Sequence, residues 1–392
     1  MRRISVEKLE PGLDLFLPVY DESHKVLLNR GVKLVDSYIS HLKELGFQSV
    51  YISNQFLEDV KHDSLISDDN MYEAIRHLNL SYKQIDKLVF DFKDKAVSQI
   101  LENLRSGRFK KAFAQTNIYN NTLRIADKII DDIITCDYHT GVNSLKTPGN
   151  YQYYHTIDTI ITAILIAKRA QLNRRQIVDL VVGLFFYDVG KIFIPKNVLD
   201  KKSALNEEEF EKIKAHPDLG YELLHEVFPI MSTHLAYQHH EWQDGSGYPR
   251  GIKGLNTIKR SSDSAGSSIL LFGEIACISD AYDALISDRP HRKAVLHDEA
   301  VRELKSSSYS HFNNEVLEKL LSLIPKYPVG SNFEISSGGK YKTCRGVVVK
   351  VPEENLNQPI LRLLFDSTGR KIKPIDLSMR KSPDLEIKLI ND

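Results

Sequence analysis

The spacing of apolar residues divides the chain into several stretches. Between residues 120 and 326 the apolar side chains recur every three or four positions, as in helices that pack with one face inward. One stripe runs from Leu123 to Ile134 and another from Ile157 to Leu165. No alternating strand pattern interrupts this stretch. It therefore predicts an all-α helical bundle.

Polar residues indicate where two helices of this bundle begin. Asn173 with Gln176, and Asn206 with Glu209, have the spacing of capping boxes. In a capping box, two side chains satisfy backbone N–H groups that lack partners in the first helical turn. The sequence therefore predicts one helix after position 173 and another after position 206.

The N-terminal residues have a mixed pattern. Leu13–Tyr20 and Val26–Leu28 predict a hairpin, and Asp36 is expected to cap a helix that Gly46 ends. Residues 1–55 therefore predict a small α+β domain. This unit is either a signal-sensing or partner module or a packing domain without a ligand.

Residues 56–119 are charged and have helical spacing. Their apolar positions run through Ile85 to Leu104, which predicts one amphipathic helix. Its basic end is more typical of a connector or a dimer helix than of a nucleic-acid-binding arm. We interpret residues 56–119 as a helical connector.

Residues 327–392 have the pattern of short strands. Val347–Val349 and Leu361–Phe365 are the clearest strands, and Gly338–Gly339 before them and Ser367–Gly369 after them supply turns. The sequence predicts a small β-rich C-terminal domain. Such a domain serves either to cover the helical domain or to dock a partner, and the first role is the stronger interpretation.

Composition narrows the function classes. At 392 residues the chain is long enough for two or three domains. Lys and Arg total 52 and Asp and Glu total 52, so net charge favours neither nucleic acid nor an anionic membrane as a partner. Three widely spaced cysteines fit a reducing compartment. With no apolar run of membrane-span length, we expect a cytoplasmic protein.

One string carries most of the candidate chemistry. Residues 239–249 read HHEWQDGSGYP, with two adjacent imidazoles followed by carboxylates and a loop of glycines and proline. Imidazole and carboxylate are ligands that Zn, Mn and Fe favour. The glycines let the backbone approach whatever the metals hold. The string predicts a metal site with a ligand-binding loop.

This string matches the second half of the HD-GYP signature, HHExxDGxGYP, and other motifs agree in order and context. They are YYH ending at 155, YDVGK over 187–191 where the family has HDxGK, HPDLG from 216, SDAYDAL over 279–285 and DRPHR over 288–292. Over roughly residues 150–295 the chain resembles the HD-GYP family. That family is a bacterial branch of the HD-domain metal phosphohydrolases, and its substrates are cyclic dinucleotides, chiefly cyclic di-GMP.

The resemblance implies a site with two divalent metals, Fe or Mn being expected. Asp188 would bridge the metals, and Lys191 beside it would contact a phosphate, so these two are the catalytic candidates. The implied metal ligands are His155, Asp188, His216, His239, His240 and Asp280; the implied substrate contacts are Lys191, Gly247, Tyr248, Pro249, Arg289 and Arg292.

The chain departs from the family pattern at three places. Tyr187 replaces a metal-ligating histidine, and a phenol with a pKa near ~10 is a poor ligand unless a strong Lewis acid such as ferric iron deprotonates it. Tyr187 is therefore a further candidate ligand, and the second metal is expected to bind weakly. Tyr151 stands where trinuclear members carry a glutamate, so we expect no third metal. Residues 257–268 form an insertion, either a lid or a surface loop without a role.

Two functions follow from the resemblance. The first is a phosphodiesterase that opens cyclic di-GMP to pGpG or GMP in bacterial second-messenger signalling. The second is a catalytically impaired receptor of cyclic di-GMP that signals to a protein partner through its N-terminal or C-terminal domain. Because the phosphate-binding and signature residues persist, catalysis is favoured. A homodimer is compatible with either function.

Overall fold

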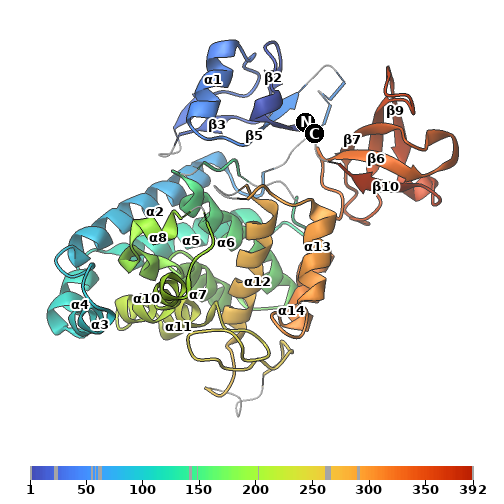
Figure 1. The fold of residues 1–392 in the computed structure, drawn as a ribbon. Coiled ribbons are helices and arrows are strands. Elements are labelled where there is room, and N and C mark those ends of the chain that lie inside the picture. Colours follow the sequence, from blue (N-terminus) through green and yellow to red (C-terminus); the bar gives the residue numbers. More distant parts are fainter. Residues whose placement is uncertain are drawn as a thin grey trace.

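The computed structural model shows a helical body with a small β unit from each end of the chain on one side of it (Figure 1). The structure describes residues 2–21, 25–53, 56–57, 59–60, 64–140, 144–147, 149–201, 203–260, 266–288 and 292–390. No helix among these residues has both the length and the apolar character needed to cross a bilayer.

The helical body is built around one hydrophobic cluster that extends from Ile66 to Ile324. The all-α prediction for this region is confirmed, because the described residues between 120 and 326 contain no strand. Its helices are α2 (Asp68–Val89), α3 (Val97–Arg105), α4 (Gly107–Ala114), α5 (Ile118–Ile133), α6 (Tyr151–Arg169), α7 (Arg174–Leu184), α8 (Lys196–Leu199), α9 (Glu207–Lys214), α10 (His216–Leu224), α11 (Ile230–Gln238), α12 (Leu271–Ile286), α13 (His297–Ser306) and α14 (Asn314–Leu323).

Both predicted capping boxes are present. The side chain of Asn173 accepts a hydrogen bond from the N–H of Gln176, whose own side chain accepts one from the N–H of Asn173. Asn206 and Glu209 make the same reciprocal pair at the start of α9. Local sequence therefore fixes the first residues of α7 and α9.

The single helix predicted across Ile85–Leu104 is wrong. Helix α2 ends at Val89 and α3 begins at Val97. Residues 90–94 between them form turns, although the apolar spacing continues through the buried Phe92. Helices α2 to α4 pack into the same cluster as α5, α6, α7 and α10 to α14 rather than standing apart as a connector. The domain boundaries proposed from the sequence stay predictions.

The N-terminal unit combines short strands with one helix. The predicted hairpin is confirmed, since Tyr20 pairs with Val26, although its turn at 22–24 lies outside the described residues. Asp36 is the first residue of α1 rather than its N-cap, which is Val35 without a side-chain cap. The elements are β1 (Arg2–Ser5), β2 (Asp14–Leu15), β3 (Val19–Tyr20), β4 (Val26–Leu28), α1 (Asp36–Glu44) and β5 (Ser49–Ser53), with β1, β5 and β2 in one sheet.

The C-terminal unit is an antiparallel sheet with the strand order β10-β6-β7-β8-β9. The predicted strands at Val347–Val349 and Leu361–Phe365 are confirmed as parts of β7 and β8. The strands are β6 (Asn332–Ser337), β7 (Arg345–Lys350), β8 (Ile360–Phe365), β9 (Lys371–Ser378) and β10 (Glu386–Leu389). A small hydrophobic cluster that includes Phe16, Leu57, Val347 and Leu364 joins this sheet to the N-terminal part of the chain.

Candidate metal centre

Three short connections bring acidic and imidazole side chains together inside the helical body. Asp188 follows α7 and opens a 3-10 turn, Val189–Phe193, while His216 begins α10. His239 and His240 follow α11 directly. The turn packs tightly on α10, because a Cβ at Gly190 would lie 2.0 Å from the carbonyl oxygen of His216. Only glycine fits there, and its absence of a side chain lets Asp188 approach His216.

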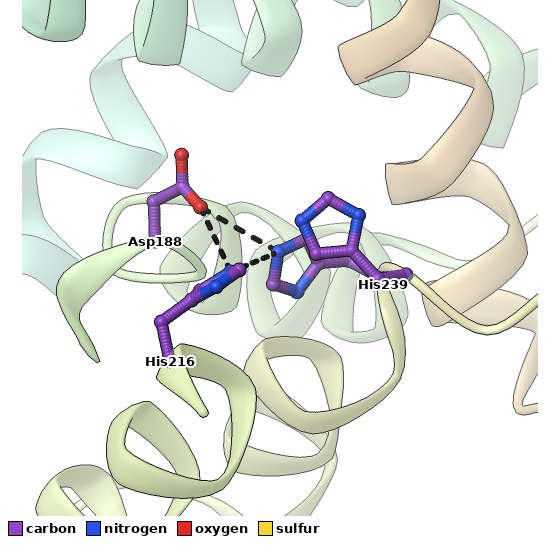
Figure 2. A group of neighbouring side chains, drawn as sticks. Asp188, His216 and His239 are labelled. Atoms are coloured by element: carbon purple, nitrogen blue, oxygen red, sulfur yellow. Dashed lines mark hydrogen bonds and ion pairs between the residues drawn. The ribbon is translucent and has the colours of Figure 1, made fainter. Parts of the chain in front are cut away.

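The side chains of Asp188, His216, His239 and His240 form what we call the acceptor cluster. One potential ligand atom from each lies within 4.8 Å of the others. The Nε2 atoms of His216 and His239 are 3.2 Å apart, and they lie 3.4 and 3.5 Å from Oδ1 of Asp188 (Figure 2). The structure thus brings together four of the predicted ligands.

Hydrogen bonds at the far side of two rings fix which nitrogen carries the proton. Nδ1 of His216 donates to the carbonyl oxygen of Ile213 at 2.6 Å, and Nδ1 of His239 donates to that of Ala236 at 2.9 Å. In a neutral imidazole the other nitrogen is then an acceptor. Both Nε2 lone pairs therefore face the same point.

Asp188 completes a group of acceptors that lacks a donor. Its Oδ1 is buried and has no hydrogen-bond partner among the described residues. A buried carboxylate oxygen facing two imidazole lone pairs is costly unless a cation lies between them. The donor set, carboxylate with imidazole, is one that Zn, Mn and Fe accept. The cluster therefore fits a metal ion.

Charge and burial keep Asp188, His216 and His240 free of protons near neutral pH. Burial alone would raise the pKa of Asp188, but the Lys191 ammonium, 2.6 Å from Oδ2, holds it well below its usual range. Burial lowers the pKa of His216 to about 4. Burial and the adjacent imidazoles also lower the pKa of His240 well below its ordinary value. Metal ligands must be deprotonated, so this state favours metal binding.

The other two predicted ligands, His155 and Asp280, lie in a second group with Tyr187. Nε2 of His155 is 2.9 Å from Oδ1 of Asp280. The hydroxyl of Tyr187 donates to that same oxygen at 2.7 Å and lies 3.2 Å from Nε2 of His155. Burial and the charges of Asp280 and Asp188 raise the pKa of Tyr187 well above its usual value, so the phenol stays neutral.

Two residues that the sequence analysis missed support His155. Oδ2 of Asp283 lies 2.5 Å from Nδ1 of His155, and Nζ of Lys146 lies 2.7 Å from both oxygens of Asp283. Asp283 could have been found from its position three residues after Asp280 on one helix. Lys146 gave no sequence signal. His155, Tyr187, Asp280, Asp283 and Lys146 together are called the hydrogen-bonded cluster below.

The predicted substrate contacts differ in position: Lys191 and Tyr248 contact the acceptor cluster, whereas Arg292 contacts the backbone of α12. Nζ of Lys191 lies 2.6 Å from Oδ2 of Asp188, and its side chain is 33% exposed. The Tyr248 ring stacks on His240 with the ring centroids 4.7 Å apart. Arg292 is exposed and donates to the carbonyl oxygen of Ala284 at 2.5 Å. Arg289 lies outside the described residues, so the structure does not place it.

Residues 245–252, which we call the GYP loop, are held in place by the buried carboxylate of Glu241. Glu241 accepts hydrogen bonds from the N–H groups of Arg250 at 2.7 Å and Ile252 at 2.9 Å. A Cβ at Gly247 would lie 2.4 Å from the carbonyl oxygen of His240, so only glycine lets the loop fold back over the centre. Pro249 follows Tyr248 through a cis peptide bond. The loop therefore places Tyr248 on His240.

The predicted insertion at 257–268 is described only at its ends. Residues 261–265 lie outside the described residues. Before them, the N–H of Ile258 donates to Glu315 at 2.8 Å, and Arg260 forms an ion pair with Glu274. The described start of the segment is thus attached to the helical body.

The chain is similar to known proteins over part of its length. A family model described as an HD domain matches residues 147–316. Cyclic di-GMP phosphodiesterase PA4108 of Pseudomonas aeruginosa is 27% identical over 228 residues, which are 58% of this chain and 51% of that protein. The cyclic di-GMP phosphodiesterase of Thermotoga maritima is 34% identical over 161 residues, 40% of each chain.

Among solved structures, the chain is similar to Bd1817, described as a HDG"Y"P protein, from Bdellovibrio bacteriovorus. The TM-score is 0.38 with 16% sequence identity, over 81% of this chain and 97% of that one. The chain spans about half the length, or less, of the curated relatives it matches. The family match and the curated relatives agree: this chain carries an HD domain related to the HD-GYP cyclic di-GMP phosphodiesterases.

Proposed function

We propose that this chain is a metal-dependent phosphodiesterase that hydrolyses cyclic di-GMP to pGpG, GMP or both. The observation that carries the proposal is the acceptor cluster, in which Asp188, His216 and His239 aim acceptor atoms at one point beside a partly exposed lysine. Relatives at 27% and 34% identity are named as cyclic di-GMP phosphodiesterases, which supports this substrate.

Asp188, His216, His239 and His240 would hold the metal. Fe or Mn is expected, because both accept imidazole and carboxylate ligands and take more than four ligands in all. A bound metal ion supplies positive charge for the anionic phosphodiester and lowers the pKa of water toward neutrality. The hydrogen bonds from Nδ1 of His216 and His239 orient both rings for this task.

Lys191 is proposed to bind a non-bridging phosphate oxygen. Its ammonium lies between the buried carboxylate of Asp188 and solvent, so one side of it is open to an anion. Ammonium groups are common phosphate binders. Arg289 and Arg292 are proposed to contact the second phosphate, and the loop of Gly247, Tyr248 and Pro249 to contact a guanine or phosphate. The Tyr248 ring already covers His240, which keeps water from that face of the imidazole.

A second candidate function is a catalytically impaired cyclic di-GMP receptor. One observation favours it: the hydroxyl of Tyr187 binds His155 and Asp280, so two predicted ligands are engaged elsewhere. Such a receptor would pass its signal to a protein partner through the N-terminal or C-terminal unit, or across a homodimer.

The decisive experiment is product analysis. Protein purified without oxygen and loaded with Fe²⁺ or Mn²⁺ is incubated with cyclic di-GMP, and the nucleotides are separated by chromatography. We expect pGpG or GMP from the unmodified chain and none from Asp188→Ala. Intact cyclic di-GMP that nevertheless binds in calorimetry would favour the receptor. Neither binding nor turnover would overturn both functions.

A further inference from the structure

The hydrogen-bonded cluster contains His155 and Asp280, whose side chains are of types that ligate metals. The hydroxyl of Tyr187, however, contacts both of them. Tyr187 places its hydroxyl oxygen 3.2 Å from Nε2 of His155 and 2.7 Å from Oδ1 of Asp280. An ion bound by both atoms would lie about 2.0–2.2 Å from each. On the side of His155 and Asp280 that faces Tyr187, such an ion would collide with the phenol oxygen.

The Tyr187 ring has no room to withdraw. It is 1% exposed and is among the largest fully buried side chains. Its ring meets that of His239 edge to face, with the centroids 5.0 Å apart. The next residue, Asp188, is bound by Lys191 at 2.6 Å. Protein interiors are close-packed, so a buried ring of this size moves only if its neighbours move too. The hydroxyl therefore keeps its place whether or not the acceptor cluster is filled.

The hydrogen-bonded cluster also has a cation of its own. The Lys146 side chain is 1% exposed and lies 2.9 Å from Asp158 and 2.7 Å from Asp283. Asp283 in turn holds Nδ1 of His155. The carboxylate of Asp283 is therefore balanced by a buried lysine, whereas Asp188 of the acceptor cluster is paired, among the described residues, with the partly exposed Lys191.

We propose that the centre of this chain takes one metal ion, in the acceptor cluster, and that Tyr187 is the positioning residue that fills the place of a second ion with its hydroxyl. This inference rests on the proposed function, because it concerns the same centre. It replaces the two-metal arrangement that the family resemblance implies. Tyr187 is thereby a hydrogen-bond donor to Asp280 and not a metal ligand.

The test is metal stoichiometry. The full chain is loaded with excess Mn²⁺ or Fe²⁺ without oxygen, desalted, and analysed for metal per chain by mass spectrometry. We expect about one ion in the unmodified protein and about two in Tyr187→His, which replaces the hydroxyl by an imidazole. Two ions in the unmodified protein would overturn the inference. So would one ion in a folded Tyr187→His.

A spectroscopic measurement tests the role of the phenol directly. A phenolate bound to ferric iron gives a visible charge-transfer absorption, whereas a neutral hydrogen-bonded phenol gives none. We expect no such band in the Fe³⁺-loaded unmodified protein or in Tyr187→Phe. A band in the unmodified protein that disappears in Tyr187→Phe would make Tyr187 a ligand and overturn the inference. This test does not depend on whether Tyr187→His folds.

The two proposals fail separately. Hydrolysis of cyclic di-GMP by protein that holds two ions would leave the proposed function standing and remove this inference. One ion per chain without hydrolysis of cyclic di-GMP would leave this inference standing and remove the proposed function.

Discussion

The acceptor cluster and the hydrogen-bonded cluster use similar side chains but balance them differently. In the acceptor cluster, Asp188 and two imidazoles aim lone pairs at a common point, and Oδ1 of Asp188 finds no hydrogen bond among the described residues. In the hydrogen-bonded cluster, the hydroxyl of Tyr187 donates its proton to Asp280 and lies beside Nε2 of His155. An aspartate with a histidine therefore indicates a metal site only where no side chain supplies the positive charge or the proton.

Two lysines repeat this contrast. Lys191 and Lys146 each lie within 2.7 Å of an aspartate oxygen. The Lys191 side chain is 33% exposed, and Asp188 is the partner the structure shows for it. Lys146 is buried between Asp158 and Asp283 and also donates to Ser287 at 2.6 Å. Lys191 is therefore the lysine we propose for binding an anionic substrate, whereas Lys146 pairs with buried groups of the fold.

The largest expected effect is loss of metal when an acceptor is removed. Loss of even an outer-shell partner costs about 10–100-fold in metal affinity, so we expect His216→Ala to lose more than ~100-fold. Hydrolysis of cyclic di-GMP should disappear with the metal. We expect His155→Ala to keep near-normal affinity, because its ring is bound by Asp280 and Asp283 instead. Calorimetric titration with Mn²⁺ measures the metal affinity of both variants.

The partly exposed His225, at the end of α10, provides the control. His225→Ala should bind Mn²⁺ as the unmodified chain does. Equal losses in His216→Ala and His155→Ala would erase the distinction between the two clusters.

Lys146→Met is expected to destabilise the fold. It leaves Asp158 and Asp283 buried without their cation, and breaking a buried pair in this way costs about 3–5 kcal/mol. Urea unfolding of the metal-free protein measures the change. Lys128→Met is the matched control, because its pair with Glu73 is 40% and 38% exposed and such surface pairs contribute about 0–1 kcal/mol.

The pH range for this measurement follows from Asp283. Burial would raise its pKa, but Lys146 and His155 lower it to about 2. An unfolded aspartate titrates near ~3.9, so the ion pair stabilises the fold fully above that pH and less as pH falls toward the folded value. The difference between Lys146→Met and the unmodified chain should therefore be full at pH 7 and shrink in strong acid. A difference that does not depend on pH would contradict this account.

Local sequence predicted the elements that depend on local rules. Capping boxes fixed the starts of α7 and α9, and apolar stripes predicted α5 and α6. The break between Val89 and Val97 was missed because the apolar spacing continues on both sides of the charged run. Of the six metal ligands that the resemblance implied, four lie together in the structure, namely Asp188, His216, His239 and His240.

The division into two clusters could not be predicted in the same way. The separation between Lys146 and Asp283 is 137 residues, and no pattern links them in the sequence. The substitution at Tyr187 was visible, but the direction of its hydroxyl depends on packing against His239. Both features are set by tertiary contacts, which periodicity and motif spacing do not report.

The smallest expected effect concerns Lys191, and it separates substrate binding from metal binding. A hydrogen bond to a charged group contributes about 1.5–3 kcal/mol. Lys191→Ala should therefore lower kcat/KM for cyclic di-GMP by ~10–100-fold. Metal content should stay unchanged, because the ligand atoms of the acceptor cluster remain. Lys196→Ala, at an exposed position on α8, should match the unmodified chain. If Lys191→Ala loses its metal instead, the lysine supports Asp188 as Lys146 supports Asp283, and the contrast between the two lysines fails.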